Sequence, residues 1–456
     1  MLSSFFRRLG RPFRAMKPGR LIVLVFLGII LLGAGLLCLP AASRSGQPTD
    51  FLTSLFTATS ATCVTGLIRV DTGMHWSMFG QAVILLLIQV GGLGFMTIAC
   101  LFFFALRRKI GLRQRMVIAQ ALGSDSYSGL VSLVRNILRG TAAVEGAGAL
   151  ILFFRFLPEF GFGRALWYGI FHSVSAFCNA GFDVLADVDA GGSLCRYVSD
   201  PVVNLTIMAL IVIGGLGFAV WGDIRHNRRL SRMQVYTRLV ILITLVLIFG
   251  GAGVIAALEW NNPGTIGGMT VPQKLLAALF QSVTLRTAGF ASFDQNALKD
   301  VTKAFCDMLM LVGGSSGSTA GGVKTVTVGV ILLAAWSTAR GRSDVRVMRR
   351  TIPQRAVSSA LALFILVLTI SMFGALFLCV ADGVSLENAV YETISALCTV
   401  GLTTGITPTL SAASQIVLII LMFFGRLGIM TISVGFMAAD PAGDRVKYAD
   451  TKIMIG

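Results

Sequence analysis

Apolar segments long enough to cross a lipid bilayer recur throughout this chain. A helix needs roughly 20 apolar residues to span the hydrocarbon core of a membrane. About eight segments meet that length, near residues 21–39, 82–104, 137–157, 202–220, 239–258, 305–331, 357–380 and 416–437. Hydrophobic residues make up 55% of the 456 positions and charged residues only 13%, which excludes an ordinary soluble domain. The sequence therefore predicts a helical protein embedded in a membrane.

The first apolar segment has an alternative interpretation as a cleaved signal peptide. Basic residues precede it, and the small residues of "LPAASRSG" follow it, as in a secretory leader. Its apolar run is longer than that of a usual leader, and cleavage would remove the helix that leads into the first polar run. We therefore expect a spanning helix here.

Basic residues are distributed unevenly between the connections. Of the 38 Lys and Arg residues, 27 fall in five places: six in 1–20, seven in 106–139, five in 221–238, six in 337–355 and three after residue 437. Because Lys and Arg accumulate on the cytoplasmic side of spanning helices, every second connection and both termini are predicted to be cytoplasmic. The inner face is also suited to anionic membrane lipids or an acidic partner.

The outer connections are acidic by contrast. They hold 14 of the 21 Asp and Glu residues, if Asp307 is counted at the outer mouth of its span. The formal net charge of +17 is therefore explained by topology, and it is no indication of nucleic-acid binding. The outer face is expected to attract cations.

Four short polar runs, each with a glycine, interrupt the apolar pattern. They read "TSATCVTGL", "SVSAFCNAGFD", "QSVTLRTAGFA" and "TISALCTVGLT", and they align Gly66, Gly181, Gly289 and Gly401, which lie 115, 108 and 112 residues apart. Periodicity of this kind predicts repeated copies of one unit. The copies are predicted at 21–105, 137–221, 238–337 and 356–438, between a basic cytoplasmic N-terminus (1–20) and a cytoplasmic C-terminus (439–456).

A short amphipathic stretch precedes each polar run, such as "DFLTSLFTATS" or "ENAVYETISAL". At about ten residues it is too short to cross a bilayer, so it must enter the membrane and stop. The following irregular backbone is tolerated at that depth only where protein or a water-filled cavity surrounds it. We therefore predict an all-α integral membrane fold with about eight transmembrane helices. Its four tandem repeats of helix, re-entrant pore helix and helix would surround one pore with pseudo-fourfold symmetry.

The glycine of each run suggests what the pore selects. Glycine permits backbone angles that turn successive carbonyl groups toward one axis, and carbonyl oxygens can replace the hydration shell of a monovalent cation. Ordinary turns between helices are the simpler alternative, but four in register are not expected by chance. The predicted filter residues are Thr62, Cys63, Val64, Thr65, Gly66, Cys178, Asn179, Ala180, Gly181, Arg286, Thr287, Ala288, Gly289, Cys398, Thr399, Val400 and Gly401.

Cysteine occupies three of the four positions that lie three residues before these glycines, and Arg286 occupies the fourth. A thiolate metal site is one interpretation, and small side chains packed behind the filter are another. No CxxC or Cys/His spacing occurs in the sequence, so potassium at the filter is the only metal expected.

A second column of aligned residues lies in the second span of each copy. The stretches "VGGLGF", "IGGLGF", "VGGSSG" and "FGRLGI" align Gly92, Gly215, Gly314 and Arg426. A charged side chain at mid-membrane is costly and usually functional, so Arg426 is predicted to form a constriction below the filter. The alternative is a structural ion pair, for instance with Glu145.

The third copy differs, because "GGSSGSTAGGVKT" (residues 313–325) interrupts its second span. Broken helices mark binding or gating regions in transport proteins. The stretch misses the phosphate-loop spacing by one residue, since Val323 separates Gly322 from Lys324, so nucleotide binding is not expected. The predicted gate residues are Gly313, Gly314, Ser315, Ser316, Gly317, Ser318, Thr319, Ala320, Gly321, Gly322, Lys324 and Arg426.

These features together resemble the Trk/Ktr/HKT superfamily of potassium transporters. The resemblance covers nearly the whole chain and rests on the four copies, their single filter glycines, the interrupted third copy and the arginine of the fourth. Trk-type subunits carry two extra N-terminal spans, which have no counterpart here. The chain is therefore most similar to the pore-forming membrane subunit of the Ktr type.

The resemblance implies potassium uptake across the cell membrane, with potassium as the transported ion, sodium as an activator and no cofactor bound by this chain. It also implies a homodimer with one pore in each subunit and a KtrA-like ring of cytosolic nucleotide-binding RCK subunits that controls opening. By the same resemblance the four aligned glycines are the filter glycines, and residues 313–324 with Arg426 form the gate. In plant relatives a serine at the first filter glycine accompanies sodium selectivity, so Gly66 favours potassium.

Other function classes remain open on the sequence alone. A sodium- or proton-coupled secondary transporter would also have repeats, but such repeats are often inverted, whereas these four run in the same direction. A sodium-conducting relative would share the whole architecture. An enzyme is not expected, since the few charged residues in the spans form no catalytic dyad or triad.

Overall fold

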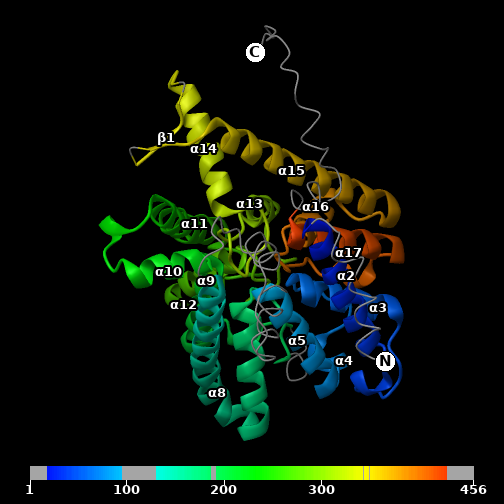
Figure 1. Ribbon diagram of the computed structural model, residues 1–456. Coiled ribbons are helices and arrows are strands. Elements are labelled where there is room, and N and C mark those ends of the chain that lie inside the picture. Colours follow the sequence, from blue (N-terminus) through cyan, green and yellow to red (C-terminus); the bar gives the residue numbers. More distant parts are fainter. Residues whose placement is uncertain (1–17, 95–129, 186–191, 343, 349, 429–456) are drawn as a thin grey trace, which may run out of the picture.

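The computed structural model describes residues 18–94, 130–185, 192–342, 344–348 and 350–428, and this part of the chain is almost entirely helical (Figure 1). Most of the predicted cytoplasmic N-terminus, the predicted C-terminus and the basic connection 106–129 lie outside the described residues. Of the described helices, four are long and apolar enough to cross a membrane, and a bent pair makes a possible fifth span. The protein is thus a multi-pass membrane protein.

The helices repeat one pattern four times. Each copy has a first helix, a shorter pore helix and a second spanning helix, which in the first copy are α2, α3 and α5. The first half of the chain contains α2 (Pro18–Leu37), η1 (Pro40–Ala42), α3 (Phe51–Cys63), α4 (Thr72–His75), α5 (Met78–Leu93), α8 (Leu130–Phe177), η3 (Cys195–Tyr197), α9 (Pro201–Leu216) and α10 (Phe218–His226). The second half contains η4 (Leu230–Arg232), α11 (Val235–Glu259), α12 (Val271–Thr284), α13 (Asp300–Met310), α14 (Thr325–Ala339), β1 (Arg346–Val347), β2 (Arg350–Thr351), α15 (Gln354–Asp382), α16 (Leu386–Leu397), η5 (Thr407–Thr409) and α17 (Ala412–Leu427).

The four copies form a closed ring. Helix α5 of the first copy packs against α8 of the second, and α9 of the second packs against α12 of the third. Helix α13 then packs against α16 of the fourth copy, whose α17 returns to α3 of the first. The two strands β1 and β2 form an antiparallel hairpin near the end of α14, at the top of Figure 1 and outside this ring.

The second copy combines its first two helices in α8. Gly161 inside this helix has a φ of 70° and a ψ of 172°, so a right-handed helix cannot continue through it. The chain therefore turns at this point, and the portion after Gly161 returns as the pore helix of the second copy, as the lower part of Figure 1 shows.

The pore helix of the first copy, α3, is enclosed by protein although it is rich in serine and threonine. In α3, ten of the 13 residues are buried, from Thr53 to Cys63 with the exception of Leu55. The helix starts at Asp50, whose carboxylate accepts a hydrogen bond from the Thr53 backbone N–H at 3.2 Å. This bond, reinforced by Arg69, holds the pKa of Asp50 below its usual value. Because the hydroxyls of α3 face protein and not lipid, a polar helix is stable at this depth.

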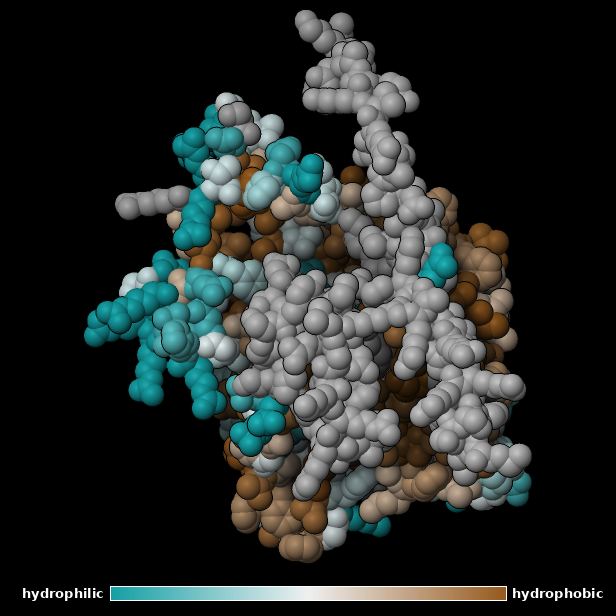
Figure 2. All heavy atoms as spheres, viewed as in Figure 1, coloured by the Kyte–Doolittle hydropathy of each residue, from teal (hydrophilic) through white to brown (hydrophobic). Residues whose placement is uncertain are grey.

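The long helices instead expose large apolar side chains on their outer surface. Leu32 of α2 is 66% exposed, Phe373 of α15 69% and Val380 of the same helix 88%. Figure 2 shows such apolar side chains over much of the visible surface. In water this surface would be unfavourable, so we assign it to the lipid of the bilayer.

The second span of each copy differs from the sequence-based prediction. The sequence predicts continuous helices over 82–104, 202–220 and 416–437, with an interruption in the third copy alone. In the structure α5, α9 and α17 end before Gly94, Gly217 and Gly428, whose φ angles are 77°, 91° and 80°. A glycine in this left-handed region ends a right-handed helix. After Gly217 the chain resumes as α10 at 92° to α9, whereas the residues after 94 and 428 lie outside the described part.

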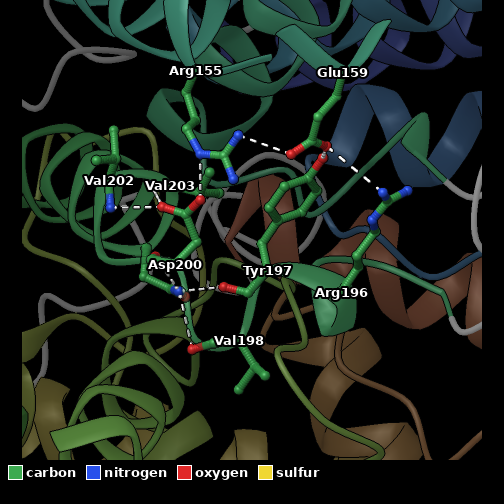
Figure 3. A network of polar contacts seen from close by, with 9 residues as sticks. Arg155, Glu159, Arg196, Tyr197, Val198, Asp200, Val202 and Val203 are labelled. Carbon is green, nitrogen blue, oxygen red and sulfur yellow. Dashed lines mark hydrogen bonds and ion pairs between the residues drawn. The ribbon is translucent and has the colours of Figure 1, made fainter.

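A polar network joins the outer end of the first part of α8 to the start of α9 (Figure 3). Arg155 donates to Asp200 at 2.5 Å and to Glu159 at 2.8 Å. Tyr197 donates its hydroxyl to the second oxygen of Glu159 at 2.5 Å, and Arg196 lies 3.9 Å from the same carboxylate. Arg155 is therefore held by two carboxylates, so it is part of a fixed structural network.

We expect the Asp200→Ala variant to be less stable than the parent protein. The Asp200 carboxylate caps α9 by accepting from the backbone N–H groups of Val202 at 2.8 Å and Val203 at 3.1 Å, and it also binds Arg155. Loss of the cap and the ion pair should lower the free energy of unfolding by about 1–2 kcal/mol. The loss of stability is measured as a lower midpoint of thermal unfolding in detergent. Arg164→Ala, at an exposed arginine of α8, is the control, and an equal loss in both variants would contradict the assignment.

Candidate cation pathway

Four glycines form a ring at the centre of the four copies. Gly66, Gly181, Gly289 and Gly401 have φ angles of 100°, 69°, 78° and 91°, in the region that favours glycine. A Cβ added to each would lie against a carbonyl oxygen of the next copy: 2.6 Å from Ala180 for Gly66, 2.8 Å from Ala288 for Gly181, 2.7 Å from Val400 for Gly289 and 1.9 Å from Thr65 for Gly401. The copies therefore meet backbone to backbone, with no space for a side chain.

The other predicted filter residues all lie in these four segments and all are buried: Thr62, Cys63, Val64 and Thr65; Cys178, Asn179 and Ala180; Arg286, Thr287 and Ala288; Cys398, Thr399 and Val400. Within the described structure, the hydroxyls of Thr65, Thr287 and Thr399 have no hydrogen-bond partner. Buried hydroxyls next to the glycine ring, together with its carbonyl oxygens, are a donor set that suits a monovalent cation.

The residue two positions before each glycine also has a left-handed backbone. Val64, Asn179, Thr287 and Thr399 have φ angles of 57°, 59°, 62° and 52°. Such angles are costly for β-branched residues, so the surrounding structure must impose them. Sequence analysis missed these left-handed backbone angles. The sequence does not indicate them, because the residue types at this position differ between the copies.

Serine residues six positions before the glycine hold three of the four segments. The Ser60 hydroxyl accepts from the Gly66 N–H at 3.1 Å, and the Ser395 hydroxyl accepts from the Gly401 N–H at 3.0 Å. Ser175 donates instead to the Phe182 carbonyl at 2.7 Å. In the third copy the Thr284 hydroxyl takes the place of the serine and donates to the Phe290 carbonyl at 2.7 Å. This serine column is visible in the aligned runs, so sequence analysis could have found it.

The residues three positions before the four glycines are of two kinds, three cysteines and one arginine. Cys63, Cys178 and Cys398 are free and buried, and among the described residues no group of three or more His, Cys, Asp or Glu side chains could hold a metal ion. Arg286 is different: it is 6% exposed, and its guanidinium contacts the Thr325 hydroxyl at 3.5 Å, at the end of the glycine-rich loop. The filter segment of the third copy is thus connected directly to that loop.

The glycine-rich loop of the third copy lies across the second copy. The Ser315 N–H donates to the Gly215 carbonyl at 3.0 Å, and the Thr319 N–H donates to the Gly214 carbonyl at 3.3 Å. The Thr319 hydroxyl reaches the carbonyl of Phe177, at the end of a pore helix, at 3.0 Å. Free carbonyls at the end of α9, left by its early termination, therefore bind the loop.

The remaining predicted gate residues continue this loop toward the fourth copy. A Cβ at Gly321 would lie 1.8 Å from the Thr399 hydroxyl, so the loop passes directly against that filter segment. Lys324 donates to the Ala320 carbonyl at 2.9 Å, and Gly313 donates to Val323 at 2.9 Å, which closes the base of the loop. The other members are Gly314, Ser316, Gly317, Ser318 and Gly322, all between these two ends.

Arg426 connects three copies by hydrogen bonds to backbone carbonyls. Its guanidinium donates to Gly91 and, at 3.1 Å, to Gly92 at the end of α5, and it also donates to Thr319 of the loop. The predicted alternative, an ion pair with Glu145, is wrong in this structure. Glu145 accepts instead from Gln89 at 3.1 Å. The electronegative C-terminal end of α5 provides the negative potential that the half-buried guanidinium of Arg426 needs.

The closest backbone approach lies one residue before the predicted second column. A Cβ at Gly91 would be 1.9 Å from the Thr62 carbonyl, one at Gly214 would be 2.0 Å from Phe177, and one at Gly425 would be 1.9 Å from Leu397. In these copies the glycine permits the second span to touch the end of the pore helix. The neighbouring column is also tight in two copies, since a Cβ at Gly92 would lie 2.5 Å from Cys178 Sγ and one at Gly314 2.5 Å from Ala320 Cβ, and only the fourth copy places a side chain there, that of Arg426.

We expect the Arg426→Gln variant to pass more cations than the parent protein. Glutamine removes the positive charge and can keep one hydrogen bond to the loop, so both the electrostatic barrier and the attachment of Thr319 weaken. Cation flux in liposomes should rise severalfold, whereas Arg426→Lys should remain close to the parent protein. A variant that elutes as an aggregate, or a flux that falls with the protein intact, would indicate a purely structural role.

Comparison with known proteins agrees with this architecture. The TrkH family profile, described as a cation transport protein, matches residues 8–448. The potassium/sodium uptake protein NtpJ of Enterococcus hirae is 39% identical over 97% of this chain and 98% of its own. The Ktr system potassium uptake protein B of Bacillus subtilis is 39% identical over 96% and 97%.

A solved structure supports the fold independently of close sequence similarity. The crystal structure of the potassium transporter TrkH from Vibrio parahaemolyticus superposes with a TM-score of 0.73 at 19% sequence identity, covering 94% of this chain and 86% of that one. The family profile and the relatives match nearly the full length of the chain, so all the described residues lie within the matched region. The chain therefore belongs to the TrkH family of cation transport proteins.

Proposed function

We propose that this protein takes up potassium across the cell membrane through the ring of four filter segments. The observation that carries the proposal is the glycine ring, in which every copy places backbone carbonyls against the next. The names of the two 39% identical relatives support the proposal, because one is a potassium/sodium uptake protein and the other a potassium uptake protein. The connections rich in acid would face outward and both termini inward, as the distribution of basic residues favours.

The mechanism follows from the order of the parts along the axis. A hydrated cation is attracted by the acidic outer connections and loses water to the carbonyl and hydroxyl oxygens of the filter segments. Below them it meets the loop 313–324 and the guanidinium of Arg426, which together obstruct the path. Flux would then depend on whether the loop stays attached to α9. No covalent bond is made or broken in the process.

We further propose the assembly that the resemblance implies: a homodimer with one pore in each subunit, and a cytosolic nucleotide-binding RCK ring that displaces the loop. Sodium would act as an activator. The name of the Enterococcus relative, a potassium/sodium uptake protein, favours a second candidate function, conduction of sodium through the same ring.

A reversal-potential measurement separates these functions. The purified chain is reconstituted alone in liposomes with potassium inside and sodium outside, and the potential at zero current is recorded. We expect a potential near the potassium limit. A potential near zero with measurable current would favour the sodium-conducting alternative, and flux that stops without a second coupled ion would favour a secondary transporter.

A further inference from the structure

Helix α10 is oriented differently from the spanning helices. It follows α9 after Gly217 and is bent by 92° from it. Helix α9 has 16 residues and α10 nine, and the two are long and apolar enough to cross a membrane only together, as a bent pair. Helix α10 is therefore the inner end of this span, and it leads into the basic residues 225–232. By the charge distribution these basic residues lie at the cytoplasmic surface.

The outward side of this region combines basic and apolar residues. We define the α10 hairpin as residues 218–234, which covers α10, η4 and the start of the turn into α11. Phe218 and Val220 are buried and anchor it, whereas Ile224 is 37% and Leu230 61% exposed. Four exposed arginines surround these apolar residues, and none forms an ion pair with a described residue: Arg225, Arg228, Arg229 and Arg232. Figure 2 shows hydrophilic side chains projecting from this side of the molecule, at the left.

The α10 hairpin is internally fixed by one carboxylate. Asp223 is 8% exposed, and it accepts hydrogen bonds from the Asn227 side chain at 2.8 Å and from the Gln234 N–H at 2.9 Å. The end of α10 is thereby joined to the start of α11. Because both ends of the hairpin are joined, the backbone positions of its four arginines are fixed relative to one another.

The other end of the α10 hairpin is attached to the gate loop. The Phe218 N–H, the first of α10, donates to the Gly317 carbonyl at 3.0 Å. Ser315 donates its hydroxyl to Leu216 on the opposite side of the break. Tyr236, just after the hairpin, donates to the Ser316 carbonyl at 3.4 Å. The observed position of the gate loop therefore depends on the position of α10.

We propose that the α10 hairpin binds anionic lipid headgroups of the cytoplasmic leaflet and thereby holds the gate loop in its attached, obstructing position. The proposal rests on the orientation given under the proposed function. Basic residues next to an anionic leaflet are attracted to its surface. The exposed Ile224 and Leu230 favour a lipid surface over an acidic protein partner, because both can enter the boundary between headgroups and acyl chains.

Hydrogen exchange in nanodiscs tests binding and coupling without requiring transport. The full-length protein is placed in zwitterionic lipid alone, or in the same lipid with phosphatidylglycerol as the anionic component. With the anionic lipid we expect roughly tenfold slower exchange of the amides in 218–226 and, through the Phe218–Gly317 bond, slower exchange in 315–319. The variant with all four arginines changed to glutamine should show neither effect.

A control variant removes the same charge elsewhere. It carries Arg340→Gln, Arg342→Gln, Arg346→Gln and Arg350→Gln, at exposed positions between α14 and α15, and it should respond to anionic lipid like the parent protein. Equal responses in all three proteins would overturn the proposal, as would protection of α10 that appears only when an acidic partner protein is added. Protection of 218–226 without any change in 315–319 would overturn the coupling to the gate. Potassium flux does not enter these measurements, so a failure of the proposed function would be seen separately.

Discussion

We expect the Gly401→Ala variant to lose selective cation uptake while remaining folded. The added Cβ would lie 1.9 Å from the Thr65 carbonyl oxygen and 2.9 Å from the Cα of Gly66, so two filter segments must separate. The φ of 91° adds backbone strain, because an L side chain rarely adopts it. Displaced carbonyls no longer fit a dehydrated cation. The preference for potassium over sodium should fall at least roughly tenfold, or about 1.4 kcal/mol.

Gly405 provides a matched control a few residues along the same loop. Its φ of 87° is nearly that of Gly401, but a Cβ there would meet nothing within 4 Å. Gly405→Ala therefore introduces similar backbone strain without entering the ring. Reversal potentials of the two variants, measured beside the parent protein, separate these causes. If both variants lose selectivity equally, strain and not the ring contact is responsible.

Deletion of residues 315–320 should produce the second large effect, a strong increase in cation flux from the isolated chain. The deletion removes the bonds that Ser315 and Thr319 make to the end of α9 and the carbonyl that Arg426 binds on the loop. Little backbone then remains across the path below the filter. Flux through liposomes should rise by an order of magnitude, about 1.4 kcal/mol in the gating equilibrium.

A milder variant shows whether the attachment itself controls flux. Thr319→Val removes only the hydroxyl that donates to Phe177 at 3.0 Å, and it should raise flux less than the deletion. Size-exclusion profiles and thermal unfolding of both variants establish that the protein is intact. Equal flux in the deletion variant and the parent protein would rule out the gate assignment.

The sequence predicted the architecture well, because its strongest features are local. Spanning length and each polar run depend on residues close together in the chain, and the period follows from aligning these local runs. The helical fold and its family are confirmed. The single glycines were identified through their alignment, and the structure places all four in one ring. The roles assigned to the filter and gate residues remain predictions.

The features that sequence analysis missed depend on contacts between distant segments. Gly94, Gly217 and Gly428 recur at one position of the aligned second spans, so the alignment could have indicated that these helices end there, but the direction that α10 takes, at 92° to α9, depends on packing between distant segments. The partners of Arg426 are backbone carbonyls, which no residue type in the sequence indicates, so the alternative that the sequence offers is a carboxylate such as Glu145. The left-handed angles at Val64 and Thr399 are imposed by the ring and not by the residues themselves.

Because one polypeptide supplies all four quarters of the ring, each quarter can change alone. In a pore built from four identical subunits, one codon alters four positions at once, and an arginine or a flexible insertion would appear four times around the axis. Here a single guanidinium and a single loop, from different quarters, meet at one carbonyl of Thr319. If the guanidinium and the loop obstruct the path as we propose, the height of the barrier and the attachment of the gate loop can be adjusted separately, in small steps, without changing the carbonyl ring.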